Sequence, residues 1–147
     1  MATTRTAKTH WEGNLLEGKG TVALESSKVG TYDVNWPARA EQPNGVTSPE
    51  ELIAAAHAAC FSMALSHALT EGGHAPETIE IDAVCRFEQL PGGGFGITSM
   101  DLEVQASVPG LEQEQFEAAL RDAEAGCPVS NALRGNVAID VRAELAA

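Results

Sequence analysis

Residues 47–69 have the sequence TSPEELIAAAHAACFSMALSHAL, and this stretch decides more of the fold than any other. Ser48 is a preferred residue at a helix N-cap, the proline after it suits the first helical position, and Glu51 is placed to close a capping box. No helix breaker follows until Gly72 and Gly73, which form a natural C-terminal cap. The sequence therefore predicts one long helix between the cap at Ser48 and these two glycines.

Strand-forming residues lie on both sides of this predicted helix. Residues 10–35 predict two or three short antiparallel strands separated by glycines, and residues 36–47 predict a loop that contains two prolines. After the helix, residues 78–90 and 96–109 predict a hairpin whose strands are joined by the sequence PGGG. The chain is therefore expected to start with β-structure and to return to it after the helix.

The last third of the chain mixes both kinds of element. Residues 111–125 place apolar side chains near one helical face, Cys127 opens a short helical turn, and residues 136–145 alternate as a final strand. The predicted order is βββ–α–ββ–αα–β, an α+β fold with an antiparallel sheet. With no internal repeat and no linker, we expect a single domain over residues 1–147.

The charge balance argues against one class of partner. The net charge is −12 at pH 7, and the acidic residues do not form a long run. A strongly acidic protein repels the phosphate backbone, so we expect no nucleic acid partner.

Composition also bears on location. Residues 1–13 lack the apolar centre of a secretory signal, and the longest apolar run, residues 52–65, is too short to span a bilayer. Three cysteines are too few for a disulfide framework of the kind found in small secreted proteins. We therefore expect no membrane partner and a cytoplasmic protein with reduced thiols.

The three cysteines differ in their predicted surroundings. Cys60 lies in mid-helix, where it is either a small buried apolar residue or a thiolate that needs a cation from another segment. Cys127 lies at the predicted start of a helix, where unpaired N–H groups lower a thiol pKa, although it also fits a tight corner without any chemistry. Cys85 lies in a predicted strand and is interpreted as a packing residue. From the residues alone, Cys127 is the better nucleophile.

Arg39 and Glu50 are the candidate charged partners of such a thiolate. Arg39 in the loop before the helix can hold a sulfur ionised, or can be an ordinary surface arginine. Glu50 can orient that arginine, or can simply complement the helix dipole. Glu50 and Cys60 are ten residues apart, about 15 Å along a straight helix. Either the helix breaks or the site forms between two chains, and we favour the second.

His57 precedes Cys60 by three residues and therefore shares its helical face. This spacing is compatible with a Cys–His hydrolase, or with a zinc site that includes His67 or Cys127. Neither alternative has a complete set of partners in the sequence, and a histidine on an apolar face is commonly a core residue.

Residues 47–69, together with AGCPVSNAL at residues 125–133, resemble the osmotically inducible protein C (OsmC) family and its relatives, the organic hydroperoxide resistance (Ohr) proteins. Residues 10–22 (HWEGNLLEGKGTV) and 108–120 (VPGLEQEQFEAAL) fit the same pattern, so the resemblance covers nearly the whole chain. The OsmC branch looks closer, because Arg39 falls shortly before the helix rather than near the N-terminus.

The resemblance implies a thiol-dependent peroxidase that reduces organic hydroperoxides, and hydrogen peroxide more weakly, without a metal or an organic cofactor. It implies antiparallel sheets wrapped around central helices in an intertwined homodimer. The peroxidatic cysteine carries over to Cys60, the resolving cysteine to Cys127, and the arginine and glutamate to Arg39 and Glu50. Similar enzymes take electrons from a dithiol such as a protein-bound lipoyl group. The alternatives are a non-enzymatic stress-related binding protein and the Cys–His hydrolase.

Overall fold

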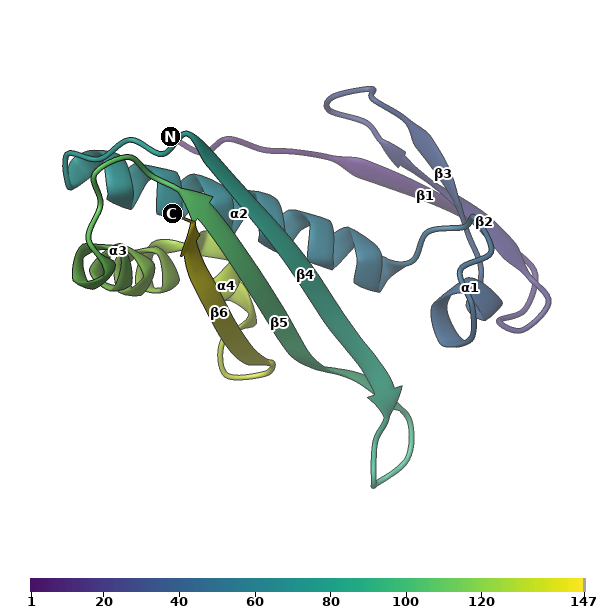
Figure 1. Cartoon of the computed structure of the whole chain (residues 1–147). Helices are drawn as coiled ribbons and strands as arrows, with labels where there is room; N and C mark the ends of the chain where they lie inside the picture. Colours follow the sequence, from purple (N-terminus) through teal and green to yellow (C-terminus); the bar gives the residue numbers. More distant parts are fainter. Residues whose placement is uncertain (147) are drawn as a thin grey trace. The chain divides into compact units, whose positions relative to one another are not determined.

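A computed structural model describes residues 1–146 of the chain, and Figure 1 follows its elements. The chain divides into two compact units, Met1–Leu52 and Ile53–Ala147, which are described in turn. The long helix α2, Pro49–Glu71, begins in the first unit and continues into the second. The expectation of one domain stays a prediction.

The first unit is built on a three-stranded antiparallel sheet in the order β1-β2-β3. Its strands are β1 (Ala7–Glu12), β2 (Lys19–Leu24) and β3 (Thr31–Val34). The short antiparallel strands predicted for residues 10–35 are therefore present.

The loop predicted for residues 36–47 contains a short helix, α1 (Trp36–Ala40). The Asn35 side chain caps it by accepting a hydrogen bond from the backbone N–H of Ala38 at 2.8 Å. Pro37 had been interpreted as a helix breaker, but proline is tolerated in the first turn, where its missing N–H removes no helical hydrogen bond. This helix carries Arg39, one of the candidate site residues, in its last turn.

The second unit has a three-stranded sheet in the order β4-β5-β6, with α3 and α4 on one of its faces (Figure 1). The strands are β4 (Thr78–Gln89), β5 (Phe95–Ser107) and β6 (Ala138–Ala146). The helices after β5 are α3 (Gln113–Gly126) and α4 (Pro128–Leu133). The predicted hairpin is confirmed, because β4 and β5 pair in antiparallel register.

One part of the sheet prediction is wrong. β6 pairs with β5 in parallel register, so this sheet is mixed rather than purely antiparallel. The reason is the connection between the two strands. Helices α3 and α4 form a long crossover that brings the chain back to the end of the sheet where β5 begins, and parallel neighbours require such a crossover.

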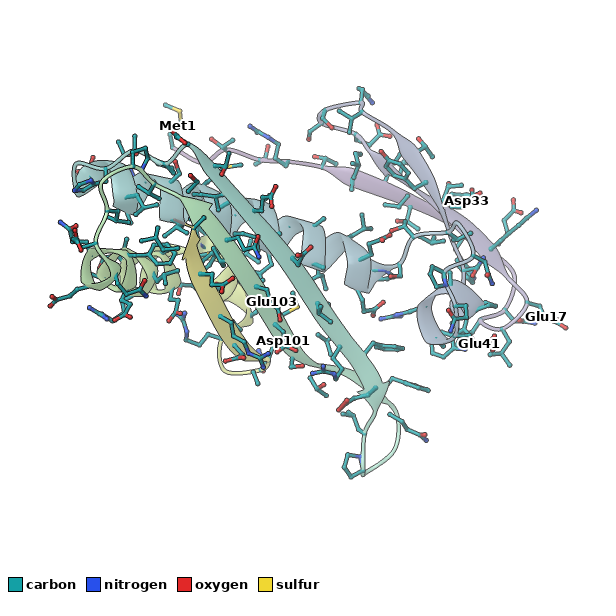
Figure 2. The ribbon with its side chains drawn as sticks, viewed as in Figure 1. Met1, Glu17, Asp33, Glu41, Asp101 and Glu103 are labelled. Carbon is teal, nitrogen blue, oxygen red and sulfur yellow. The ribbon has the colours of Figure 1, made fainter. Side chains whose placement is uncertain are left out.

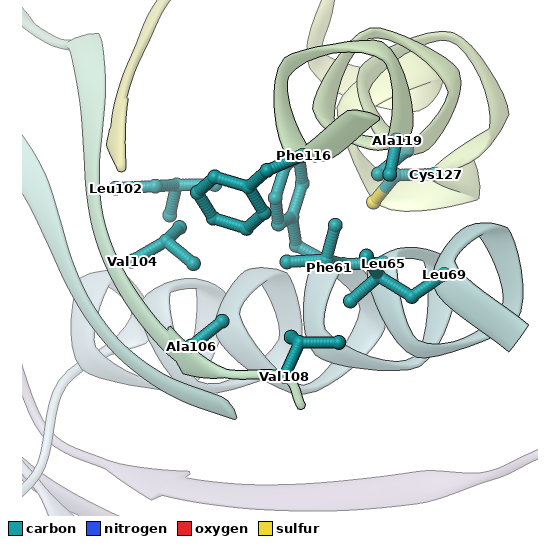
Figure 3. Packing of buried hydrophobic residues seen from close by; sticks show 11 residues of the cluster. Phe61, Leu65, Leu69, Leu102, Val104, Ala106, Val108, Phe116, Ala119 and Cys127 are labelled. Atoms are coloured by element: carbon teal, nitrogen blue, oxygen red, sulfur yellow. The ribbon is translucent and has the colours of Figure 1, made fainter. Parts of the chain in front are cut away.

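The core of the second unit lies between this sheet and the helices (Figure 3). Strand β5 alternates strictly, so that Leu102 and Val104 are buried while Glu103 between them is exposed. Phe61 of α2 and Phe116 of α3 are both fully buried against this face of the sheet. The core therefore fixes α2 and α3 to the same strand.

Helix α2 begins and ends as the sequence predicts. The Ser48 hydroxyl accepts from the N–H of Glu51 at 3.1 Å, and Gly73 has a positive φ of 88° just after the helix end. The Glu51 carboxylate differs from the prediction, since it accepts from the Thr47 hydroxyl instead of closing a capping box on Ser48. The N-cap is thus confirmed, and Glu50 is left available for another partner.

By length and composition alone, α2 is also apolar enough to cross a membrane. The sequence analysis counted only the nearly continuous apolar run of residues 52–65. An average of hydropathy over a longer part of the helix also accepts the polar residues around this run, so the apolar stretch becomes longer. In the structure, Phe61, Leu65 and Leu69 of this helix pack into the core of the second unit. Helix α2 therefore has a core role.

Acidic side chains are spread over many elements rather than gathered in one segment (Figure 2). Glu17, Asp33 and Glu41 are exposed in the first unit, and Glu103 is exposed on β5. This distribution agrees with the absence of a long acidic run in the sequence.

We expect the Phe116→Ala variant to lose about 3–5 kcal/mol of unfolding free energy, because the ring is fully buried between α3 and the sheet. Urea unfolding followed by circular dichroism measures the loss. Glu124→Ala, an exposed position on the same helix, is the matched control and should change stability by less than about 0.5 kcal/mol. Equal losses for the two variants would contradict this description of the core.

Candidate active site

Two cysteines from distant parts of the sequence face each other in the second unit. Cys60 lies in the middle of α2, and Cys127 is the N-cap of α4, 67 residues later. Their sulfurs are 3.4 Å apart, and both thiols are free. Cys127 is fully buried and lies beside Ala119 (Figure 3). Cys60 is only partly buried. The structure therefore brings together the two cysteines that the sequence analysis singled out.

The two thiols differ in acidity. Burial acts to raise the pKa of Cys127, but hydrogen bonds from the side chain and N–H of Ser130, from Cys60 and from the Val129 N–H together outweigh it, and the pKa is lowered. Burial is the largest effect and raises the pKa of Cys60; the Val129 N–H lowers this pKa, and the adjacent Cys127 raises it again. Cys127 is the more acidic thiol of this pair, as its cap position predicts. Cys60 still needs a cation to become a thiolate.

His57 has a hydrogen-bond partner that the sequence analysis missed. Its Nε2 lies 2.7 Å from the Ser130 hydroxyl oxygen, and both residues are buried. Burial lowers the pKa of His57, which favours the neutral ring. Among residues 1–146 no hydrogen bond joins His57 to Cys60, so the pairing that a Cys–His hydrolase needs is not formed. One signal in the sequence could have identified Ser130. It lies three residues after Cys127, the spacing at which a residue of the first helical turn contacts an N-cap side chain.

The predicted charged pair forms in the first unit. Arg39 Nε lies 2.8 Å from Glu50 Oε1, with Arg39 one-third exposed and Glu50 nearly buried. The second carboxylate oxygen of Glu50 has no hydrogen-bond partner among residues 1–146. Because the Glu50 carboxylate is buried, its ion pair with Arg39 fixes the direction of the guanidinium. Glu50 can therefore orient Arg39, as the sequence predicts.

Helix α2 continues without a break from Glu50 to Cys60. The ten residues between them correspond to about 15 Å along the helix axis. The broken helix that the sequence analysis considered is therefore not the solution in this chain.

Two further ideas from the sequence can be compared with the structure. Within the described part of the chain, no group of three or more His, Cys, Asp or Glu side chains is arranged to hold a metal ion. Three apolar side chains near Cys60 could either shape a pocket for an alkyl tail or belong to the core: Phe61 is a core residue, Met63 is 70% exposed and Ile53 is half-buried. Phe61 is thus unavailable to a ligand in this conformation.

The sequence model of one protein family, described as OsmC-like protein, matches residues 42–142. The chain belongs to the OsmC-like protein family. The match includes Glu50 and both facing cysteines, so it covers most of the residues discussed above.

Characterised members of the OsmC-like family and its relatives are similar over most of their length. The chain is 41% identical over 140 residues to peroxiredoxin OsmC of Escherichia coli, which covers 95% of this chain and 96% of that protein. It is 39% identical over 101 residues to an organic hydroperoxide resistance protein of Xanthomonas axonopodis, covering 68% and 67%. Similarity to the OsmC protein extends over more of the chain, in agreement with the branch expected from the sequence.

Solved structures support the same fold. A crystal structure of an organic hydroperoxide resistance protein OsmC from Legionella pneumophila matches with a TM-score of 0.76 and 29% identity, covering 98% of both chains. The organic hydroperoxide resistance protein OhrB of Bacillus subtilis matches with a TM-score of 0.72 and 28% identity, covering 95% of this chain and 98% of that one. The predicted OsmC-like α+β fold is confirmed.

We expect protonation of His57 to destabilise the folded chain. The folded state disfavours the charged ring, so the unfolded state takes up a proton first as the pH falls below about 6.5. The free energy of unfolding should therefore be independent of His57 ionisation above that pH and should decrease below it. For a single group the decrease is at most about 1.4 kcal/mol per pH unit. Urea unfolding at several pH values between 7.5 and 5 measures this slope.

His57→Gln keeps a donor at the position of Nε2 but does not titrate, so its slope should be smaller than that of the wild type. His67→Gln changes an exposed histidine of the same helix and serves as the control. Identical slopes for His57→Gln and the wild type would show that His57 makes no such contribution.

Proposed function

We propose that the protein is a thiol-dependent peroxidase that reduces organic hydroperoxides to alcohols, and hydrogen peroxide more weakly. The observation that carries this proposal is the pair of unbonded sulfurs of Cys60 and Cys127, 3.4 Å apart. Two thiols at this distance can form a disulfide with little movement of the backbone. The family membership supports the substrate class, because relatives are named peroxiredoxin and organic hydroperoxide resistance protein.

The proposed cycle uses the two sulfurs in turn. The Cys60 thiolate attacks one oxygen of the hydroperoxide, breaks the O–O bond and becomes a sulfenic acid, while the alcohol leaves. Cys127 then attacks the oxidised sulfur, forms the Cys60–Cys127 disulfide and releases water. A dithiol reduces the disulfide and regenerates both thiols. No step of this cycle calls for a metal or an organic cofactor.

Arg39 and Glu50 take the charged roles in this proposal. The guanidinium would favour the Cys60 thiolate and stabilise negative charge on the departing oxygen. Because Glu50 and Cys60 are about 15 Å apart along an unbroken helix, we assign Arg39 and Glu50 to one subunit and Cys60 to the other. The protein would then be a homodimer with two sites.

The surface of α2 supports an association of this kind. Met63 is 70% exposed, and three small residues of the same helix, Ala55, Ala56 and Ala59, are exposed as well. A helix that is apolar all round is usually covered on every side, and small side chains allow close packing. A second copy of the chain would cover this surface.

The electron donor and the location follow from the same proposal. A compact dithiol such as a protein-bound lipoyl group can supply both electrons in one binding event and is itself oxidised to a cyclic disulfide. Free thiols persist in a reducing compartment, so the protein is assigned to the cytoplasm.

The remaining alternative is a stress-related binding protein in which the two thiols pack without turnover. The donor from Ser130 directed at the Cys127 sulfur favours the enzyme, because a core contact does not require one. The Cys–His hydrolase is less favoured, since His57 is directed at Ser130.

We expect the protein to consume cumene hydroperoxide in the presence of dithiothreitol, and Cys60→Ser to abolish this activity. Cys85→Ser is the matched control and should keep wild-type activity, because Cys85 lies in β4 and not at the thiol pair. One equivalent of hydroperoxide should lower the intact mass by two hydrogens, mapped to Cys60–Cys127. Equal consumption by wild type and Cys60→Ser would refute the enzymatic proposal.

Arg39→Met should lower kcat/KM for cumene hydroperoxide about a hundredfold, as expected for losing a donor to a developing oxyanion. Co-expression of Arg39→Met with Cys60→Ser chains under two affinity tags tests where Arg39 acts. A mixed dimer holds one intact site if the site joins two subunits, and should recover about half the activity of a wild-type dimer. A mixed dimer as inactive as its parents would place Arg39 and Cys60 of the site in one subunit.

A further inference from the structure

A buried polar pair lies directly behind the thiol pair. His57 and Ser130 are 0% and 2% exposed in surroundings that are otherwise mostly apolar. They are 73 residues apart in the sequence and connect α2 to α4 through the 2.7 Å contact between Nε2 and the hydroxyl oxygen. A buried hydrogen bond between distant helices fixes their relative position, because breaking it leaves two polar groups unsatisfied.

The ring hydrogen of the neutral His57 belongs on Nε2. Its Nδ1 is buried and has no hydrogen-bond partner among residues 1–146. An orphaned buried N–H is rarer than an acceptor left without a donor, so the tautomer with a bare Nδ1 is favoured. His57 therefore donates from Nε2, and Ser130 accepts.

An accepting Ser130 hydroxyl keeps its own hydrogen for another acceptor. The Cys127 sulfur is next to it: the Ser130 N–H donates to that sulfur at 3.5 Å, and the Ser130 side chain acts to lower the pKa of Cys127. The hydroxyl hydrogen can therefore join the N–H at the same sulfur. Hydrogen bonds to an ionised acceptor are stronger than those to a neutral one, so this arrangement favours the thiolate.

We propose that His57, Ser130 and Cys127 form a hydrogen-bonded relay, in which His57 Nε2–H donates to Ser130 Oγ and the Ser130 hydroxyl donates to the Cys127 sulfur. The relay makes Cys127 the ready nucleophile of the second chemical step. His57 is a positioning residue that acts through Ser130. The role of the relay in disulfide closure rests on the proposed peroxidase cycle. The hydrogen bonds of the relay and their effect on the ionisation of Cys127 do not.

The step that the relay serves is closure of the disulfide. The Cys127 thiolate gives an electron pair to the sulfur of the Cys60 sulfenic acid, the S–S bond forms and the S–O bond breaks. Hydroxide leaves and takes up the proton that Cys127 released on ionising, so the net product is water. As negative charge leaves the Cys127 sulfur, the Ser130 hydroxyl loses its strongest acceptor, so the relay favours the reactant thiolate.

The surroundings of Cys127 simplify the test. The titratable groups that face its sulfur are Cys60 and, behind Ser130, His57, both from α2. Helix α3 contributes Ala119 and Ala123 to the same cluster, which are apolar. The Cys60 thiol and the Val129 N–H also lower the pKa of Cys127, so the test replaces Cys60 in the reference and changes only relay residues against it.

The first experiment titrates Cys127 by thiolate absorbance at 240 nm in a Cys60→Ser, Cys85→Ser background, which leaves it the single cysteine. At the pH where the reference is half ionised, adding Ser130→Ala should lower the ratio of thiolate to thiol about tenfold. Ser130→Thr retains the hydroxyl and should stay within about twofold. An unchanged ratio in Ser130→Ala would overturn the relay. This titration needs no turnover, so it is independent of the proposed function.

The second experiment follows disulfide closure by rapid quench after one equivalent of cumene hydroperoxide, over a range of pH. In the otherwise wild-type chain, Ser130→Ala should move the pH midpoint of the closure rate upward and leave the rate at high pH within about threefold. A lower plateau with an unmoved midpoint would show that Ser130 serves packing alone, and would refute the relay.

The role of His57 is tested by a pair of variants. The same pair tests the relay if the Ser130→Ala variant does not fold. His57→Phe fills the site without a donor and should lower the thiolate ratio several-fold. His57→Gln keeps a donor near the position of Nε2 and should restore the ratio to within about twofold of the reference. Equal ratios in the two variants would remove His57 from the relay.

Discussion

The contact between the start of α4 and the middle of α2 is the constraint on which the rest of the structure depends. It is made by residues far apart in the sequence and is fixed by a buried hydrogen bond and by core packing around Cys127. Helix α2 packs in turn against β5, whose alternating side chains supply one wall of the core, and Cys127 at the start of α4 belongs to the same core. A small displacement of α4 would leave His57 and Ser130 unsatisfied, so the distance between the two sulfurs is well defined.

Predictions from sequence succeeded where the governing interactions are local. The N-cap at Ser48, the glycine end of α2 and the hairpin around PGGG all depend on neighbours within a few residues. The pairing of Arg39 with Glu50 spans eleven residues and was one of the two predicted roles of Glu50, although the Glu51 capping box predicted beside it does not form. Short-range chemistry of this kind is encoded in residue types and spacing.

The errors and omissions concern long-range geometry or borderline local signals. The parallel pairing of β6 with β5 depends on how α3 and α4 cross the sheet, which no local pattern specifies. The partner of His57 lies 73 residues away, so periodicity could not identify it. Helix α1 was missed for a different reason, since a proline in its first turn has the same appearance in sequence as a proline in a loop.

Unequal burial of the two sulfurs gives them different relations to the solvent. Cys60 is partly exposed, while Cys127 is enclosed by α3, α4 and α2. A reagent that arrives from outside meets the first sulfur and has no direct route to the second. Damage by excess oxidant is therefore concentrated on Cys60, and the enclosed thiol beside it is the nearest group able to intercept the first oxidation product before a further oxygen is added. The fold thus leaves one sulfur of the pair open to reagents from solution and shields the other from them.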